Sequence, residues 1–511
     1  MKPQQLFNEA PTLGQVLQGQ VACARTSLPT ITAIAVAIAS SVVLTLAGCA
    51  NSAGITSSAQ TIAPASVGLE ANATAPDGPV APLVSADWWK NFGDTTLNET
   101  VERALAGNPS LKAAQARLER AQAAVDVNKS ADGLHLNLEA GATRQRFSAN
   151  SIYPPPLGGS IRTLANAQIG ASYEFDFFGR NRAAIEAAVG TQRAAQADLQ
   201  AARIVLASNV ARTYVQLARL FAQREVAERS LKQRDEILSL IRQRVSGGLD
   251  TNVELRQGEG ALPESRQQIE QLDEQIALAR HALAALTAQA PSAYDTLVVP
   301  LRSVQAVPVP TALPADLLGR RADISAARWR IEAATSDVKS AKASFYPNIN
   351  LSAFVGLASI GLNNLVKASS EQYGIGPALT LPIFDGGRLR ANLRGKNADL
   401  DAAIESYNGA VIDAVHDAAD QISSVRSIER QQAQQANALT ASESAYDLAA
   451  QRYKAGLGTY LTVLNAEVSV LNQRRLGADL KARALDLQIG LIRALGGGYV
   501  EQVTQTAAAG R

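Results

Sequence analysis

Residues Gln451–Val468 read QRYKAGLGTYLTVLNAEV and lie between two long segments, rich in alanine, glutamine and arginine, that both have a helical pattern. Gly456 and Gly458 predict the turn of a helical hairpin, because glycine adopts a positive φ without strain. A similar stretch, QRVSGGLDTNVEL, occupies Gln243–Leu255. A repeated hairpin tip predicts a duplicated architecture.

Between the helical segments, the apolar period changes from 3.6 to 2 in four places. Alternating apolar and polar residues predict strands over about 134–147, 167–178, 348–357 and 373–384. Long helices are predicted over about 180–246 and 388–454, followed by tips at 247–250 and 455–458. Each long helix would span roughly 100 Å, whereas helices of globular domains average about 11 residues. The predicted fold is therefore mainly α-helical with a β portion, built from two repeats at 86–315 and 316–496.

The N-terminal region carries the pattern of an export signal. An apolar run, Ile31–Ala47, follows basic residues and ends in LAGC at Cys49. The run would form roughly 25 Å of helix, slightly short of a bilayer core, and small residues precede the cysteine. We therefore predict a cleaved signal over 1–48, with an uncleaved anchor helix as the alternative. LAGC resembles a bacterial lipoprotein box, which implies acylation of Cys49 and a flexible tether over 49–85, and Ala50 favours transport to the outer membrane.

Composition and residue spacing argue against several other functions. The formal net charge of +2 is too small to suggest nucleic-acid binding. His135, His281 and His416 lie far apart, so no metal site is predicted. Asp417 and Asp420 lie three residues apart on one helix face, which indicates an ordinary charge pair rather than a catalytic dyad. With no nucleophile–base pair and no phosphate loop in the sequence, we predict neither an enzyme nor a bound cofactor.

The four strands match the length that a tilted strand needs to cross a bilayer, about 9–11 residues. Four strands cannot close a barrel, and an open edge in lipid leaves backbone groups unpaired at several kcal/mol each. Other copies of the chain are therefore expected to complete the sheet, and twelve strands would leave a water channel. The alternatives are a soluble sheet packed on helices and a solvent-exposed coiled-coil rod.

Four ordered motifs closely resemble segments of the TolC/OprM-like outer-membrane factors: WWKNFGD at 88–94, SYEFDFFGR at 172–180, LGRRADI at 318–324 and YKAG at 453–456. The resemblance extends from about Trp88 to Gly498. It implies a homotrimer with a twelve-stranded β-barrel in the outer membrane and a long periplasmic α-helical barrel. It also implies docking to a periplasmic adaptor and, through it, to an inner-membrane transporter that is expected to be proton-driven. Ala322 stands where the family usually has proline, so a slightly looser helix start is expected there.

In that family the helical barrel closes at its periplasmic tips. Matched position by position, the family's constricting leucine falls on Leu461, its gate aspartate on Asn465, and an arginine of some relatives on Val468. The alternative for Leu461 is packing in a coiled-coil seam. Asp250 and Glu254 lie near the other tip, so any acidic ring must come from them. Because Asn465 and Val468 stand in place of charged residues, opening of the tips is expected to depend only weakly on salt and pH.

The adaptor-docking rim is expected at the tip residues Gly247, Gly248, Leu249, Gly456, Leu457 and Gly458. The implied function is passive export of drugs or other small toxic compounds through an outer-membrane duct that is lipid-anchored at Cys49 and extends into the periplasm. The alternatives are a duct for one-step protein secretion and a non-conducting structural lipoprotein that spans the periplasm. A polar, disordered tail is expected over 497–511.

Overall fold

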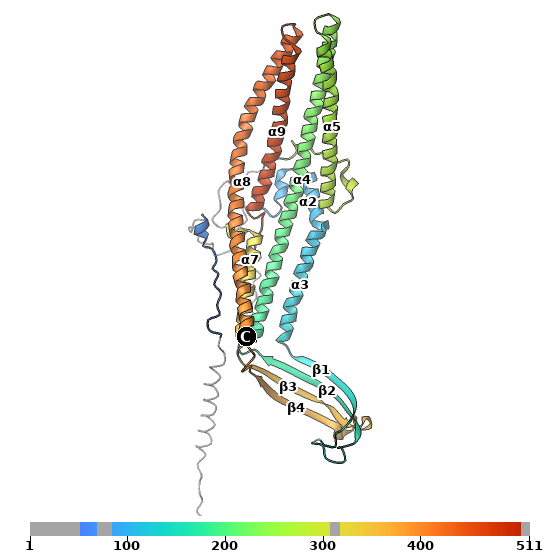
Figure 1. The fold of residues 1–511 in the computed structure, drawn as a ribbon, viewed down its shortest axis with the longest axis vertical. Coiled ribbons are helices and arrows are strands. Elements are labelled where there is room, and N and C mark those ends of the chain that lie inside the picture. Colours follow the sequence, from blue (N-terminus) through green and yellow to red (C-terminus); the bar gives the residue numbers. More distant parts are fainter. Residues whose placement is uncertain (1–51, 69–83, 151, 307–316, 502–511) are drawn as a thin grey trace, which may run out of the picture. The chain divides into compact units, whose positions relative to one another are not determined.

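The computed structural model describes residues 52–68, 84–150, 152–306 and 317–501, and helices dominate them (Figure 1). The main elements are α2 (Thr95–Gly107), α3 (Pro109–Ala131), β1 (His135–Arg146), β2 (Ile161–Phe175), α4 (Arg180–Ser246), α5 (Asn252–Leu286), α6 (Leu317–Arg320), α7 (Ala322–Ala343), β3 (Asn348–Ile360), β4 (Glu371–Thr380), α8 (Arg388–Lys454) and α9 (Tyr460–Ala494). The order α3-β1-β2-α4-α5 recurs as α7-β3-β4-α8-α9. The duplicated helix-and-strand fold is thereby confirmed.

In each repeat, two shorter helices lie end to end beside one long helix. Asn108 joins α5 to α3, because its side chain caps α3 at the Ser110 N–H (2.8 Å) and donates to the Leu286 carbonyl oxygen (2.8 Å). In the second repeat, Arg321 at the start of α7 donates to the Ala494 carbonyl oxygen at the end of α9 (3.4 Å). The long helices α4 and α8 have 67 residues each. The stacked helices α3 and α5 have 23 and 35 residues, and α7 and α9 have 22 and 35. Each stacked pair therefore nearly matches its long neighbour in length.

Helices and strands follow the same lateral order. α4 packs against α3, α5, α7 and α9, whereas α8 packs against α7 and α9. The strands form one antiparallel sheet in the order β1-β2-β3-β4. Among the described residues, the outer edges of β1 and β4 pair with no strand, and the helices that adjoin these strands, α3 and α8, lie at the two ends of the helical row. The open edge of the sheet at β1 therefore continues into the open edge of the helices at α3, and the open edge at β4 continues into that at α8.

The sheet has one apolar face and one polar face. A row of apolar side chains crosses all four strands on one face, and every member is exposed: Leu138, Ile169, Val355 and Tyr373. On the other face, Gln168 donates to Glu139 (3.2 Å), and Gln372 donates to Gln168 (3.1 Å). None of the described helices has both the length and the apolar character needed to cross a membrane.

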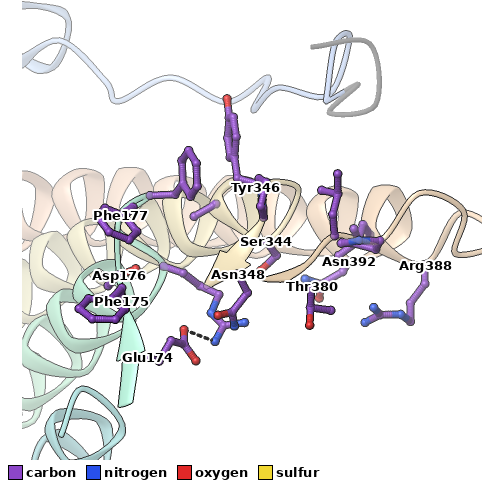
Figure 2. A pocket seen from close by; sticks show the side chains of 17 residues that line it. Glu174, Phe175, Asp176, Phe177, Ser344, Tyr346, Asn348, Thr380, Arg388 and Asn392 are labelled. Carbon is purple, nitrogen blue, oxygen red and sulfur yellow. Dashed lines mark hydrogen bonds and ion pairs between the residues drawn. The ribbon is translucent and has the colours of Figure 1, made fainter. Parts of the chain in front are cut away.

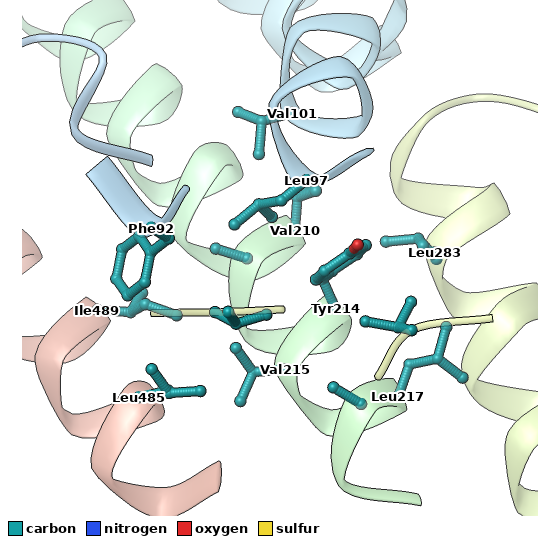
Figure 3. Packing of buried hydrophobic residues seen from close by; sticks show 14 of the residues in the cluster. Phe92, Leu97, Val101, Val210, Tyr214, Val215, Leu217, Leu283, Leu485 and Ile489 are labelled. Atoms are coloured by element: carbon teal, nitrogen blue, oxygen red, sulfur yellow. The ribbon is translucent and has the colours of Figure 1, made fainter. Parts of the chain in front are cut away.

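The main hydrophobic core lies where the N-terminal WWKNFGD motif packs against α4, α5 and α9 (Figure 3). Trp88 and Phe92 are buried there, in a short 3₁₀ turn. Asp94 caps α2 at the Thr96 N–H (2.9 Å) and also accepts a hydrogen bond from the Tyr214 hydroxyl (3.0 Å). This motif therefore acts in the structure as a core and capping element.

Some strand boundaries differ from those expected. β2 begins at Ile161 rather than at about 167, because its first residues pair with β1 and those from Leu164 onward pair with β3 as well. It ends at Phe175 rather than 178, since the chain turns at Gly179, which has a φ of 75°. β4 ends at Thr380 rather than 384, because Thr380 pairs with Asn348, the first residue of its partner strand β3.

The expectation of a flexible tether over 49–85 is wrong for residues 52–67, which lie along α8. Asp401 accepts hydrogen bonds from the hydroxyls of Ser57 (2.5 Å) and Ser58 (3.1 Å), and from two backbone N–H groups. Asn408 accepts from the N–H of Ile62 (2.8 Å) and donates to the carbonyl oxygen of Gln60 (2.9 Å). Side chains of α8 thus hold a segment that has no periodicity of its own. Cys49 lies outside the described residues.

The expectation of a disordered tail from 497 is also wrong for residues 497–501. Gly496, Gly497 and Gly498 have φ values of 101°, 55° and 80°. A Cβ at Gly498 would lie 2.4 Å from the Ser85 carbonyl oxygen, so the backbone can pass there only as glycine. The segment then packs on α7, where the Tyr499 hydroxyl lies 3.1 Å from the Ser325 Oγ.

Candidate functional site at the hairpin tips

The two hairpin tips have the same backbone chemistry. Gly248 and Gly456 have φ values of 73° and 75°, and the N–H of the next residue, Leu249 or Leu457, donates back to the preceding helix at 2.8 Å. This is the helix ending that glycine favours. Gly458 does not share the positive φ expected for it; a Cβ there would instead lie 3.3 Å from the backbone N of Tyr453.

A buried polar cluster joins the two tips. The Arg244 guanidinium forms a bidentate ion pair with Asp250 (2.8 and 3.1 Å) and donates to the Tyr453 carbonyl oxygen (3.1 Å). The Tyr453 hydroxyl donates to Asp250 Oδ2 (2.5 Å), and the guanidinium lies 4.6 Å from the ring centroid. The side chains of Arg244 and Asp250 are each only 11% exposed. We call Arg244, Asp250 and Tyr453 the tip lock.

The tip lock shifts the ionisation of its members. The hydrogen bond from Arg244 holds the pKa of Asp250 below its usual value. Burial, reinforced by the neighbouring Asp250 carboxylate, raises the pKa of Tyr453 well above its usual value. Each group therefore keeps the protonation state that the cluster requires over a wide range of pH.

Apolar packing continues beneath the tip lock. Ile241 from α4, Tyr453 from α8, and Tyr460 and Val463 from α9 form one buried cluster. The cluster contains residues of both hairpins, so the tips cannot separate without exposing it to water.

A second buried ion pair lies further along α9. Arg234 donates to Glu467 (3.0 Å), to the Ala261 carbonyl oxygen (3.1 Å) and to Ser265 Oγ (3.1 Å). Glu467 is only 7% exposed. This arginine therefore ties α4, α5 and α9 together. Neither cluster was predicted from the sequence, although Arg244 and Tyr453 lie within the repeated tip stretches.

The gate residues inferred from the resemblance lie on an exposed stripe of α9. Leu461 and Val468 are 59% and 46% exposed, and Asn465 is also exposed. Within the chain, Tyr460 and Val463 rather than Leu461 form the buried contact with the first hairpin.

The two acidic residues of the first hairpin have partners within the chain. Asp250 belongs to the tip lock. Glu254 completes a capping box, accepting hydrogen bonds from the N–H (2.9 Å) and hydroxyl (2.5 Å) of Thr251. Both carboxylates therefore stabilise their own hairpin.

The docking-rim residues lie at the outermost part of the tips. Leu249 and Leu457 are exposed apolar side chains at equivalent positions of the two turns. Between them and the helices, Gly247 closes α4 and Gly456 closes the end of α8. The tips thus present two matching apolar residues on short, well-defined turns.

A second site lies at the opposite ends of the long helices, where strands become helices (Figure 2). A cavity of about 420 Å³ is lined by the ends of β2 and β3, the end of α7 and the start of α8. Arg180 donates to Glu174 across the β2–α4 turn (2.6 Å), and the rings of Phe178 and Tyr346 stack at 4.8 Å. Phe177 and Phe384 are exposed nearby. Exposed aromatic rings at the ends of strands are typical of a membrane–water boundary.

Asp417 and Asp420, which were predicted to be an ordinary charge pair, have different surroundings. Asp417 accepts from Arg493 (3.2 Å) and lies 3.6 Å from Arg321, whereas Asp420 is exposed. Among the described residues, no three His, Cys, Asp or Glu side chains are grouped so that they could hold a metal ion.

Comparison with known proteins agrees with this geometry. Residues 100–289 and 313–497 match the family described as outer membrane efflux protein. The fusaric acid resistance protein FusA of Burkholderia cepacia is 39% identical over 318 residues, which are 61% of this chain and 60% of that protein. The multidrug resistance outer membrane protein MdtQ of Escherichia coli O6:H1 is 34% identical over 81% of this chain and 88% of its own length.

Solved structures give the same result. The outer membrane protein VceC of Vibrio cholerae has a TM-score of 0.77 and 36% identity, covering 81% of this chain and 99% of its own. The outer-membrane channel OprN has a TM-score of 0.76 and 28% identity, covering 83% of this chain and 97% of its own. The chain belongs to the outer membrane efflux protein family.

Proposed function

We propose that this chain forms a homotrimeric, lipid-anchored duct that exports drugs or other small toxic compounds and closes at the hairpin tips. The observation that carries the proposal is the coincidence of open edges in both layers: β1 and β4 border the sheet, and α3 and α8 border the helices. Names of relatives, which refer to multidrug and fusaric acid resistance, favour small toxic compounds over secreted proteins.

Three copies would pair β4 of one protomer with β1 of the next. The sheet would then have twelve strands and no free edge, which removes the cost of unpaired backbone groups in lipid. The exposed row at Val355 would face lipid, and the polar row at Gln168 would face water. α8 would pack beside α3 and α5 of the neighbouring copy and close the helical layer in the same step.

The position of the N-terminal segment supports a lipid anchor at Cys49. From Ser57 to Ile62, contacts move along α8 from Asp401 to Asn408, away from the strands. The described residues before Ser57 therefore continue towards the start of α8, where Arg390 donates to the Ala53 carbonyl oxygen (3.5 Å). Cys49 and Ser57 are eight residue steps apart in the sequence, which span at most roughly 28 Å when extended. Helix α8 needs about 20 Å for the residues between its start and Asp401, so an acylated Cys49 could reach the membrane boundary.

We assign the aperture to Leu461, Asn465 and Val468. Three copies of this stripe around one axis would form a narrow apolar ring, which can exclude water and ions by dewetting. The tip lock would hold each hairpin pair in the closed arrangement. Opening would require α8 and α9 to move away from the first hairpin.

The tips are also the proposed contact for the rest of the pump. Leu249 and Leu457 would form a ring of six apolar side chains in the trimer, suited to end-on docking of a periplasmic adaptor. The adaptor would connect the duct to an inner-membrane transporter, for which a proton-driven type is proposed.

The gate is tested by conductance of the purified trimer in planar bilayers. Leu461→Ser should raise the closed-state conductance several-fold, because a polar ring stays wet. Leu476→Ser is the matched control, since Leu476 is an exposed leucine of the same helix far from the tip. Unchanged conductance of Leu461→Ser would refute the gate assignment. Absence of conductance even with the tip lock also removed would favour a structural lipoprotein.

A further inference from the structure

A cavity of about 600 Å³ lies between α4, α7 and the C-terminal segment. Neither α8 nor α3 lines it, so it lies away from the edges where copies of the chain are proposed to meet. No part of the export path described above involves it.

One wall of the cavity is a row of hydrogen-bond donors on a single face of α4. Arg193, Gln196, Gln200 and Arg203 line it at helical spacing. From Arg193 to Arg203 the row extends roughly 15 Å, which matches four or five residues of extended peptide.

The opposite wall comes from α7 and from the end of the chain. Arg328 and Trp329 contribute side chains, and Tyr499, Val500 and Glu501 contribute the C-terminal segment. The Arg193 guanidinium lies 4.4 Å from the centroid of the Trp329 ring, so the two walls touch at one end.

Charge in the cavity is unbalanced. Three arginines line it, but Glu501 is its one carboxylate, and that carboxylate pairs with Arg328. In the part of the chain that the structure describes, neither Arg193 nor Arg203 has a carboxylate partner. The cavity therefore has spare positive charge and favours an anion.

Glu501 shows which anion the cavity fits. Its two oxygens accept from the Arg328 guanidinium at 2.8 and 2.7 Å, and one of them also accepts from the Trp329 Nε1 at 2.8 Å. Both Arg328 bonds come from one nitrogen, Nη2, so the two oxygens of the carboxylate share that charged donor. Glu501 belongs to the C-terminal segment, so the chain already places a side-chain carboxylate at one end of the cavity.

We propose that this cavity binds short, extended peptides with a free carboxylate, and that Glu501 is a tethered carboxylate that occupies one of its three arginines, Arg328. An incoming carboxylate would engage Arg203 and Arg193 along the donor row. Removal of the tethered carboxylate would make Arg328 and Trp329 available as well, so affinity should rise.

The test uses the full-length purified protein and N-acetyl-dialanine as the probe, with its C-terminal amide for comparison. Trp329 is one of only three tryptophans, and the other two are buried in the core, so binding can be followed by tryptophan fluorescence. Glu501→Ala should bind the free acid at least tenfold more tightly than the native protein, since a tethered group acts at millimolar effective concentration.

Arg203→Gln in the same background should weaken binding at least tenfold, whereas Arg256→Gln, at an exposed arginine of the hairpin, should leave it unchanged. Thermal unfolding of each variant establishes that it is folded.

The proposal is overturned if the folded Glu501→Ala protein does not bind the acid, if the amide binds equally well, or if Arg203→Gln has no effect. Equal competition by inorganic phosphate would make the cavity a general anion site and overturn the peptide assignment. None of these readouts depends on conductance, so the proposed gate is tested separately.

Discussion

At the scale of single residues, the tips depend on groups whose partners are far away in the sequence. Asp250 lies near a turn, where an acidic residue usually contacts solvent, yet Arg244 and Tyr453 enclose it. Breaking a buried ion pair by removing one partner leaves an uncompensated charge at a cost of about 3–5 kcal/mol. Removal of either Arg244 or Asp250 alone is therefore expected to destabilise the proposed closed arrangement of the tips, and solvent salt should screen this buried pair little.

Closed-state conductance should stay constant between pH 5 and pH 9. The pKa of Asp250 is lowered, so the stabilisation by its ionised form is present above about pH 4 and is lost only as pH falls through the lowered pKa. The pKa of Tyr453 is raised, so the stabilisation by its protonated form is present below about pH 10 and is lost only as pH rises through the raised pKa.

Tyr453→Phe provides the comparison for this measurement, since it keeps the ring and removes the hydroxyl. Loss of a hydrogen bond to a charged group costs about 1.5–3 kcal/mol, so closed-state conductance should rise at every pH. A conductance that changes between pH 5 and pH 9 in the native protein would show that another group controls the tip.

At the scale of elements, the chain ends are structural parts of the helical region. Residues 52–67 lie along α8, and Gly496–Gly498 thread between Arg320, Ile204 and Ser85. Neither segment has a periodic pattern of apolar residues, so their composition predicts flexible linkers. Their order comes from side-chain acceptors on α8 and from the absence of a Cβ at three successive positions.

Gly498→Ala should lower the free energy of unfolding by at least about 2 kcal/mol, because the new Cβ would meet the Ser85 carbonyl at a positive φ. Gly395→Ala in the interior of α8, where no atom lies within 4 Å of the new Cβ, should stabilise by about 0.5–1 kcal/mol. Thermal unfolding in detergent measures both changes. Equal effects of the two substitutions would show that the C-terminal turn is not constrained.

Asp401→Ala should release the N-terminal segment, because the carboxylate accepts four of its hydrogen bonds. Limited proteolysis within residues 52–67 should become at least several-fold faster. Asp399→Ala is the matched control, since Asp399 is an exposed aspartate of the same helix with one weak contact to Lys396. Equal cleavage rates in both variants would mean that Asp401 does not hold the segment.

At the scale of the whole molecule, the proposed membrane location of a sheet completed by other copies explains both its exposed apolar face and its open edges. In water, an exposed Val355 would tolerate a charge. In a membrane sheet, the same side chain faces lipid, where arginine at mid-depth costs about 2–4 kcal/mol.

Val355→Arg should therefore reduce the amount of trimer in outer-membrane fractions at least several-fold. Ser352→Arg lies on the same strand, β3, on the opposite face of the sheet, and should assemble normally because that face contacts water. The measurement is immunodetection of trimer in fractionated membranes. Normal assembly of Val355→Arg would refute the orientation proposed for the sheet.

Periodicity in the sequence was enough to reveal the duplicated order of helices and strands, because a period of 3.6 or 2 is a local property of the chain. Gly248 and Gly456 marked both tips for a local reason too, since glycine adopts a positive φ without strain. Partnerships such as Arg244 with Asp250 and Tyr453, Arg234 with Glu467, and Glu501 with Arg328 depend on which helices lie side by side. The exposure of Leu461 and the binding of residues 52–67 to α8 likewise required the tertiary structure, because burial and long-range hydrogen bonds are set by packing between segments that periodicity treats separately.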